Sequence, residues 1–165
     1  MPSPTSTDPP PIRSASDSEI TLRRVRVFLL LLVAVALGGS LFELFLIDHD
    51  EHWQQQIPLY LIGASLAILL AHAIVRTAWT VRLVRVAMLL LLLAGAVGAA
   101  MHFQSNVEFQ REMEPDVPTG ELVWKSLSAT APPALAPFVL AQLGLIGLIA
   151  CYRHPATRRA SPEER

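Results

Sequence analysis

Four long apolar runs constrain this chain more than any other feature of its sequence. They lie at about residues 27–47, 57–75, 86–103 and 134–152. A helix needs about 20 mostly apolar residues to cross the hydrocarbon core of a bilayer, and each run approaches or exceeds that length. The chain is 52% hydrophobic and 16% charged, which leaves too little polar surface for a soluble globule of 165 residues. The sequence therefore predicts an integral membrane protein with four transmembrane helices.

The segments outside the apolar runs complete the predicted organisation. Residues 1–19 are rich in Pro, Ser, Thr and Asp and have almost nothing to bury, so we expect a disordered tail. Residues 20–153 form the transmembrane domain, and residues 154–165 form a basic tail. The first run is too long for the apolar region of a signal peptide, and three more runs follow it. We therefore expect it to remain as the first helix.

Two of the connections have distinctive residues. Pro58 suits the first turn of the second helix, where its missing N–H would lack a partner anyway. Residues 104–130 form the one sizeable loop, which is acidic. Within it, Leu122, Val123, Trp124 and Leu127 predict a short interfacial helix with the tryptophan at headgroup level.

Positive charge is distributed unevenly among the connections, and this predicts orientation. Only Arg111 and Lys125 lie on one side of the predicted spans. The positive-inside rule places the side that holds the other eleven in the cytoplasm, together with both termini. The expected location is a bacterial inner membrane, crossed several times. The eleven residues are Arg13, Arg23, Arg24, Arg26, Arg76, Arg82, Arg85, Arg153, Arg158, Arg159 and Arg165.

Small residues within the runs predict close packing of the helices. Glycine, alanine and serine let helix backbones approach one another in a membrane. Short connections after the first two helices make neighbours antiparallel, so we expect an all-α, up-down bundle of four transmembrane helices. The small residues are Gly38, Gly39, Ser40, Gly63, Ala67, Ala71, Gly95, Ala99, Gly144 and Gly147.

Polar side chains inside the apolar runs are costly and therefore usually face a partner or a cavity. Glu43 and His102 both lie near the outer ends of their helices, and we expect Glu43 to face the bundle interior with His102 within reach. Such a pair would serve as a proton relay or orient a metal ligand, or it would be a structural hydrogen bond. His72 lies near the opposite end of the second helix, about 20 Å from the outer boundary. That depth argues against a haem held between His72 and His102, and we expect His72 to be a packed or interfacial residue.

The outer face also offers ligands for a divalent transition metal. Two histidines in the first outer loop are spaced i, i+3, and two glutamates after the third run are spaced i, i+4, so each pair would share a helix face. Imidazole and carboxylate groups suit zinc, copper or iron. The alternative is a solvated polar surface, since the His-Glu-x-x-His motif is missing from the sequence. The candidate metal ligands are Glu43, His102, His49, His52, Glu108 and Glu112.

Two functional classes follow from these observations. The first is a non-enzymatic membrane module that assembles with itself or with a larger membrane complex. The second is a small-ion site, for a metal or protons, on the outer half of the bundle at Glu43 and His102. The sequence contains no phosphate-binding loop, dinucleotide fingerprint or nucleophile elbow. Its arginines indicate contact with the lipid bilayer, and nothing in it predicts binding to nucleic acid.

Overall fold

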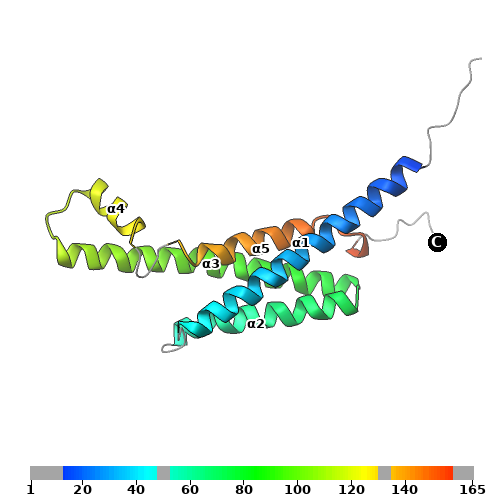
Figure 1. Ribbon diagram of the computed structural model, residues 1–165, viewed down its shortest axis with the longest axis horizontal. Coiled ribbons are helices and arrows are strands. Elements are labelled where there is room, and N and C mark those ends of the chain that lie inside the picture. The colour runs from blue at the N-terminus through cyan, green and yellow to red at the C-terminus, as the bar shows by residue number, and fades with distance from the viewer. Residues whose placement is uncertain (1–12, 48–52, 130–134, 158–165) are drawn as a thin grey trace, which may run out of the picture.

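The computed structural model of the chain describes residues 13–47, 53–129 and 135–157. Within these ranges the protein is all-α, as predicted, and Figure 1 shows its helices. They are, in chain order, α1 (Arg13–Leu46), α2 (Trp53–Ile74), α3 (Ala78–Met113), α4 (Thr119–Leu127) and α5 (Phe138–Ala150), followed by a 3-10 turn, η1 (Pro155–Thr157).

Three helices are long and apolar enough to cross a membrane, namely Asp17–Leu46 within α1, all of α2 and all of α3. The fourth apolar run contains α5, which has 13 residues and rises only about 20 Å. Turns on both sides limit its length. Pro137 stands at its N-cap, and after Cys151 the backbone of Arg153 takes a φ of 47°, a left-handed conformation typical of helix ends.

Several helix ends differ from the predicted ones. α1 begins at Arg13, so the last part of the predicted tail is helical. α2 begins at Trp53, which places Pro58 inside the helix, so its predicted position in the first turn is wrong. α3 continues to Met113, through the first third of the predicted loop, because the polar residues after Phe103 keep the helix going without a glycine or proline. The predicted short helix is confirmed as α4.

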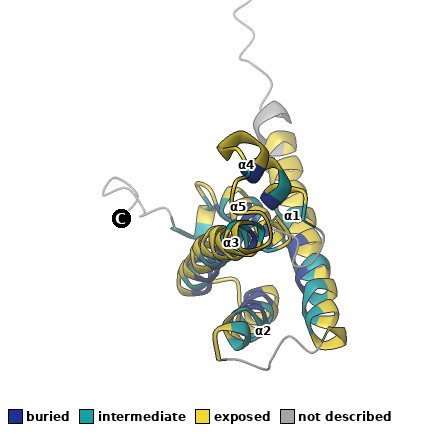
Figure 2. Cartoon of the chain, turned by 90° about the vertical axis from the view of Figure 1, so that its left-hand side faces the viewer, coloured by how far each residue is buried: buried dark blue, intermediate teal, exposed yellow. Residues whose placement is uncertain are grey.

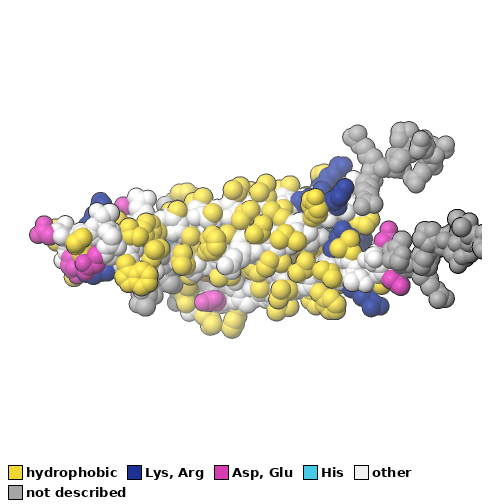
Figure 3. All heavy atoms as spheres, turned by 90° about the horizontal axis from the view of Figure 1, so that it is seen from above, with side chains coloured by type: hydrophobic (Ala, Val, Ile, Leu, Met, Phe, Trp, Pro, Cys, Tyr) yellow, Lys and Arg dark blue, Asp and Glu magenta, His cyan; other side chains and the backbone are white. Residues whose placement is uncertain are grey.

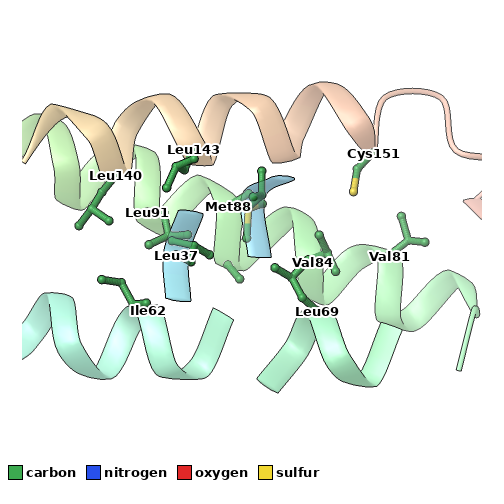
Figure 4. Close-up of a cluster of buried hydrophobic side chains, with 12 residues drawn as sticks. Leu37, Ile62, Leu69, Val81, Val84, Met88, Leu91, Leu140, Leu143 and Cys151 are labelled. Carbon is green, nitrogen blue, oxygen red and sulfur yellow. The ribbon is translucent and has the colours of Figure 1, made fainter. Parts of the chain in front are cut away.

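The four long or apolar helices surround one core in the order α1, α2, α3, α5. α3 packs along both α5 and α2, while α1 packs on α2 and α5, and its backbone stays more than 8 Å from that of α3 between Cα atoms. Among these four, each helix runs in the opposite direction to the one before it (Figure 1). α3 extends well beyond the other three to the place where α4 folds back on it. Figure 4 shows Met88 and Leu91 of α3 between Leu143 of α5 and Ile62 of α2.

The closest contact in the bundle is between α3 and α5, and glycine makes it feasible. A Cβ added at Gly144 would lie 2.6 Å from the Leu92 backbone nitrogen, and one at Gly95 would lie 2.8 Å from the Pro137 carbonyl oxygen. Both distances are too short for real atoms, so only glycine fits there. Gly147 likewise faces the Met88 side chain. The predicted packing role of these glycines is confirmed.

The glycines of α1 and α2 behave differently. At Gly38, Gly39 and Gly63, no described atom lies within 4 Å of an added Cβ. The backbone contact predicted at these positions therefore does not form within the chain. Most of the apolar surface of these helices is also exposed, since only 11%, 22% and 28% of the most apolar 18-residue segments of α1, α2 and α3 are buried. Figure 2 shows the exposed residues around the outside of the bundle, which is the arrangement expected for contact with lipid.

The charged side chains are segregated along the long axis of the molecule. Figure 3 shows most basic side chains gathered at the end where α1 begins and most acidic ones at the far end of α3, with a few charges of the opposite sign at each end and a mostly apolar belt between. The basic end carries Arg23, Arg24, Arg26, Arg76, Arg82, Arg85 and Arg153, and the acidic end carries Glu108, Glu112, Glu114, Asp116 and Glu121.

The contact between α3 and α5 can be tested with two matched substitutions. Gly144→Ala places a methyl group against the α3 backbone, which cannot move aside as a side chain can, and should lower the free energy of unfolding by about 1–3 kcal/mol. Gly63→Ala is also inside a helix but meets open space, so it should be neutral or stabilise by about 0.5–1 kcal/mol. Unfolding of the purified protein in mild detergent measures both. Equal behaviour of the two variants would contradict the described packing.

Candidate functional site

The four predicted metal ligands that the structure describes belong to two helices, α1 and α3. Glu43 is exposed near the end of α1, while Glu108 and Glu112 are exposed on the part of α3 beyond His102. His49 and His52 lie outside the described residues. In the ranges that the structure covers, no three His, Cys, Asp or Glu residues are close enough to hold one ion.

The expected interior position of Glu43 is wrong. α1 packs through Val33 and Leu37, with Leu44 partly buried on the same side. At 100° per residue, Glu43 lies well outside this stripe and points away from the core. The Cα atoms of α1 and α3 stay more than 8 Å apart, and no ion pair joins Glu43 and His102.

His102 is half-buried, close to the contact between α3 and α4. Its Nδ1 is buried and has no hydrogen-bond partner in the described part of the chain, and the Ser126 hydroxyl is in the same situation. One turn after His102, the Asn106 side-chain amide donates a 3.1 Å hydrogen bond to the Ser126 carbonyl. This bond and the buried Leu122 hold α4 against α3.

Exposed ion pairs support α4 from outside. Lys125 Nζ lies 2.6 Å from a carboxylate oxygen of Glu114 and 3.0 Å from one of Glu121. The hydrogen bonds that Lys125 donates to Glu114 and then to Glu121 raise the pKa of Lys125. Since these groups are exposed to water, the ion pairs orient α4 more than they stabilise it.

The opposite, basic end has a more elaborate polar structure, centred on the C-terminus of α5. The last carbonyl groups of a helix lack partners within the helix and carry a partial negative charge. Arg85 of α3 donates from Nη2 to the Cys151 carbonyl at 2.7 Å, and Arg26 of α1 donates to those of Tyr152 and Arg153 at 3.1 and 3.3 Å. Two neighbouring helices thus cap α5.

His72 belongs to the same end and is buried, which confirms the expectation that it is a packed residue. Its Nδ1 lies 3.0 Å from the Thr80 hydroxyl, which donates its own proton to the Val75 carbonyl at 2.6 Å. The His72 Nδ1–H is therefore the donor to Thr80. The ring of His72 also meets the ring of His154 edge to face, with centroids 5.8 Å apart.

His154 is held in one neutral tautomer. Its Nδ1 accepts a hydrogen bond from the Ala156 backbone N–H at 3.2 Å, so the ring proton is on Nε2. Burial lowers the pKa of His154, and the neighbouring Arg26, His72 and Arg85 lower it further. At neutral pH the ring is thus an uncharged hydrogen-bond donor among arginines.

A groove of about 880 Å³ lies between α1 and α2 at this basic end. Most of its polar groups lie toward the basic end of the molecule, and leucines and alanines line the rest of it. The polar lining comprises Glu19, Arg23, Arg26, His72, Arg76, Arg153 and His154. The apolar lining includes Leu30, Leu31, Ala34, Leu66, Leu69 and Leu70. A groove of this size can hold a small amphiphile.

From the sequence, the basic residues were expected to set the topology and to contact the lipid bilayer, and this groove was not predicted. One signal was present. Arg26 directly precedes the first apolar run, and His72 and Arg76 are spaced i, i+4 at the end of the second, so both polar groups border apolar helix faces. Which faces meet depends on the packing of α1 against α2, and that is a property of the fold.

Comparison with protein families, with curated proteins and with solved structures gave no match. The function therefore has to be inferred from the geometry of this chain.

Proposed function

We propose that the protein is a four-span, non-enzymatic module of a bacterial inner membrane, which acts by assembling with itself or with a larger membrane complex. Three long apolar helices and the apolar belt between two charged ends support residence in a membrane. The arginine-rich end, under the positive-inside rule, would face the cytoplasm together with both termini.

The proposed fourth span is α5. It lies along the apolar part of α3, and its C-terminus is capped by arginines of the basic end, while α4 lies at the opposite end of α3. The chain between α4 and the end of α5 must therefore pass from one end of the bundle to the other. Since α5 rises only about 20 Å, the turns on either side of it would complete the crossing, or the bilayer would thin around it.

One observation carries the proposal that the module assembles. Small residues on α1 and α2 leave open helix surface, where none of the described residues of the same chain packs closely. Gly39 on α1 and Ala64, Ala67 and Ala71 on α2 are all exposed. In a membrane, surfaces of small residues let helices of different chains approach and gain contact area.

A leucine on this surface should weaken assembly without harming the fold. Ala67→Leu removes the close approach, and we expect the crosslinked fraction in native membranes to fall about 5-fold or more. Ala96→Leu is the control, because Ala96 is exposed on α3 and away from the α1 and α2 surface. The proposal fails if the wild-type protein yields no crosslinked species, or if both variants assemble like the wild type.

A second candidate is the small-ion site on the outer half of the bundle, built on Glu43 and His102. It is favoured by the buried Nδ1 of His102, which has no hydrogen-bond partner among the described residues. Because Glu43 is exposed and the Cα atoms of α1 and α3 stay more than 8 Å apart, this site requires either a rearrangement or a second chain.

Metal binding tests this candidate. The purified protein should bind zinc or copper stoichiometrically, and Glu43→Gln combined with His102→Ala should abolish binding, because a carboxylate and an imidazole are lost together. His72→Ala serves as the control, since His72 lies at the basic end. Absence of binding at micromolar metal would eliminate the ion site.

A further inference from the structure

The groove between α1 and α2 combines two chemical surfaces in a fixed order. Four arginines and one carboxylate lie around its polar end, so positive charge dominates there. Arg23, Arg76 and Arg153 are exposed, and their guanidinium groups match the geometry of a phosphate. From this end the apolar lining runs along both helices toward the middle of the bundle.

The length of the groove matches one leaflet of a bilayer. On α1 its lining extends from Glu19 to Ala34, which is about 22 Å of helix rise. Half the thickness of a bilayer with its headgroups is about 20–22 Å. The arginines thus lie where the headgroups of that leaflet would be, and Leu30, Leu31 and Leu70 lie at the depth of its acyl chains.

We propose that this groove is a specific binding site for an anionic phospholipid, with the phosphate held by Arg23, Arg76 and Arg153 and the acyl chain lying between α1 and α2. A basic recess between membrane helices is the physical setting in which anionic headgroups are recognised. A zwitterionic headgroup would bring its own positive charge against the arginines and bind more weakly.

Two structural details fix the positions and the proton of groups at the proposed headgroup site. The bonds from Arg26 to the Tyr152 and Arg153 carbonyls hold the turn after α5 beside the groove, which places Arg153 on its rim. His154 keeps its ring proton on Nε2 and contributes a neutral donor rather than a competing acceptor. A second groove of about 680 Å³ between α1 and α5 shares Arg26 and Arg153, so apolar surface flanks α1 on both sides of this position.

Lipid binding to the full-length protein in detergent tests the proposal by native mass spectrometry, with phosphatidylglycerol and phosphatidylcholine of identical acyl chains as probes. The wild type should prefer phosphatidylglycerol by about 10-fold or more. Arg23→Gln combined with Arg76→Gln should weaken that binding by about 10- to 30-fold. Neither side chain caps α5, so the fold should persist, and thermal unfolding checks that it does.

The matched control is Arg24→Gln combined with Arg82→Gln, which removes the same charge from exposed positions at the same end but outside the groove. It should change phosphatidylglycerol affinity by less than about 2-fold. Ala34→Trp fills the apolar part of the groove and should also abolish the preference, whereas Ala96→Trp on α3 should not.

Three results would overturn the proposal. They are equal binding of the two lipids, an equal loss of affinity in the control and groove variants, and full displacement of the lipid by an equal concentration of inorganic phosphate. The last result would show that the acyl chain contributes nothing. These measurements do not depend on self-assembly, so they can succeed or fail separately from the proposed function.

Discussion

The close approach of α3 and α5 is the contact on which the rest of the structure depends. Gly95, Gly144 and Gly147 bring the two helices so near that backbone faces backbone, and no other residue fits at Gly95 or Gly144. In a membrane, apolar surface alone does not drive helices together, because lipid is equally apolar, so dispersion contacts between close backbones matter more. α5 has 13 residues, too few to cross a membrane by themselves, so its position depends on its packing along α3. The remaining helices follow, since α2 packs on the other side of α3 and α1 closes the gap between α2 and α5.

That contact also explains the difference between the two ends of the molecule. Because α5 ends beside α1 and the start of α3, Arg26 and Arg85 reach its terminal carbonyls, and the turn that follows brings His154 against His72. The basic end is therefore held together by hydrogen bonds between helices distant in sequence. At the acidic end, α3 extends beyond its neighbours, and among the described helices α4 alone packs there, held by Asn106, Leu122 and exposed ion pairs.

Much of this fold was predictable from sequence because membrane helices obey simple rules of length and composition. The apolar runs predicted an all-α fold, and the residues from Leu122 to Leu127 predicted the short helix α4. Glycine spacing identified Gly95, Gly144 and Gly147, but it could not distinguish them from Gly38, Gly39 and Gly63, which face open space. The candidate site was harder to predict. Glu43 was expected inside because a carboxylate in an apolar run needs a partner, yet the packing face of α1 passes through Val33 and Leu37 and leaves Glu43 outside. Rotation of a helix about its axis is set by its neighbours, and an apolar run with leucine on all sides does not reveal it.

We propose that α5, packed along α3, carries the chain back across the membrane, which would place the basic groove on the cytoplasmic side. Single cysteines report this directly in a Cys151→Ala background, with Thr119→Cys at the start of α4 and Pro155→Cys after α5, both at exposed positions. A membrane-impermeant maleimide applied to intact spheroplasts should label the cysteine at position 119, and it should reach position 155 only after lysis. Labelling of both cysteines from the same side would contradict the account, because α5 would then not span the membrane.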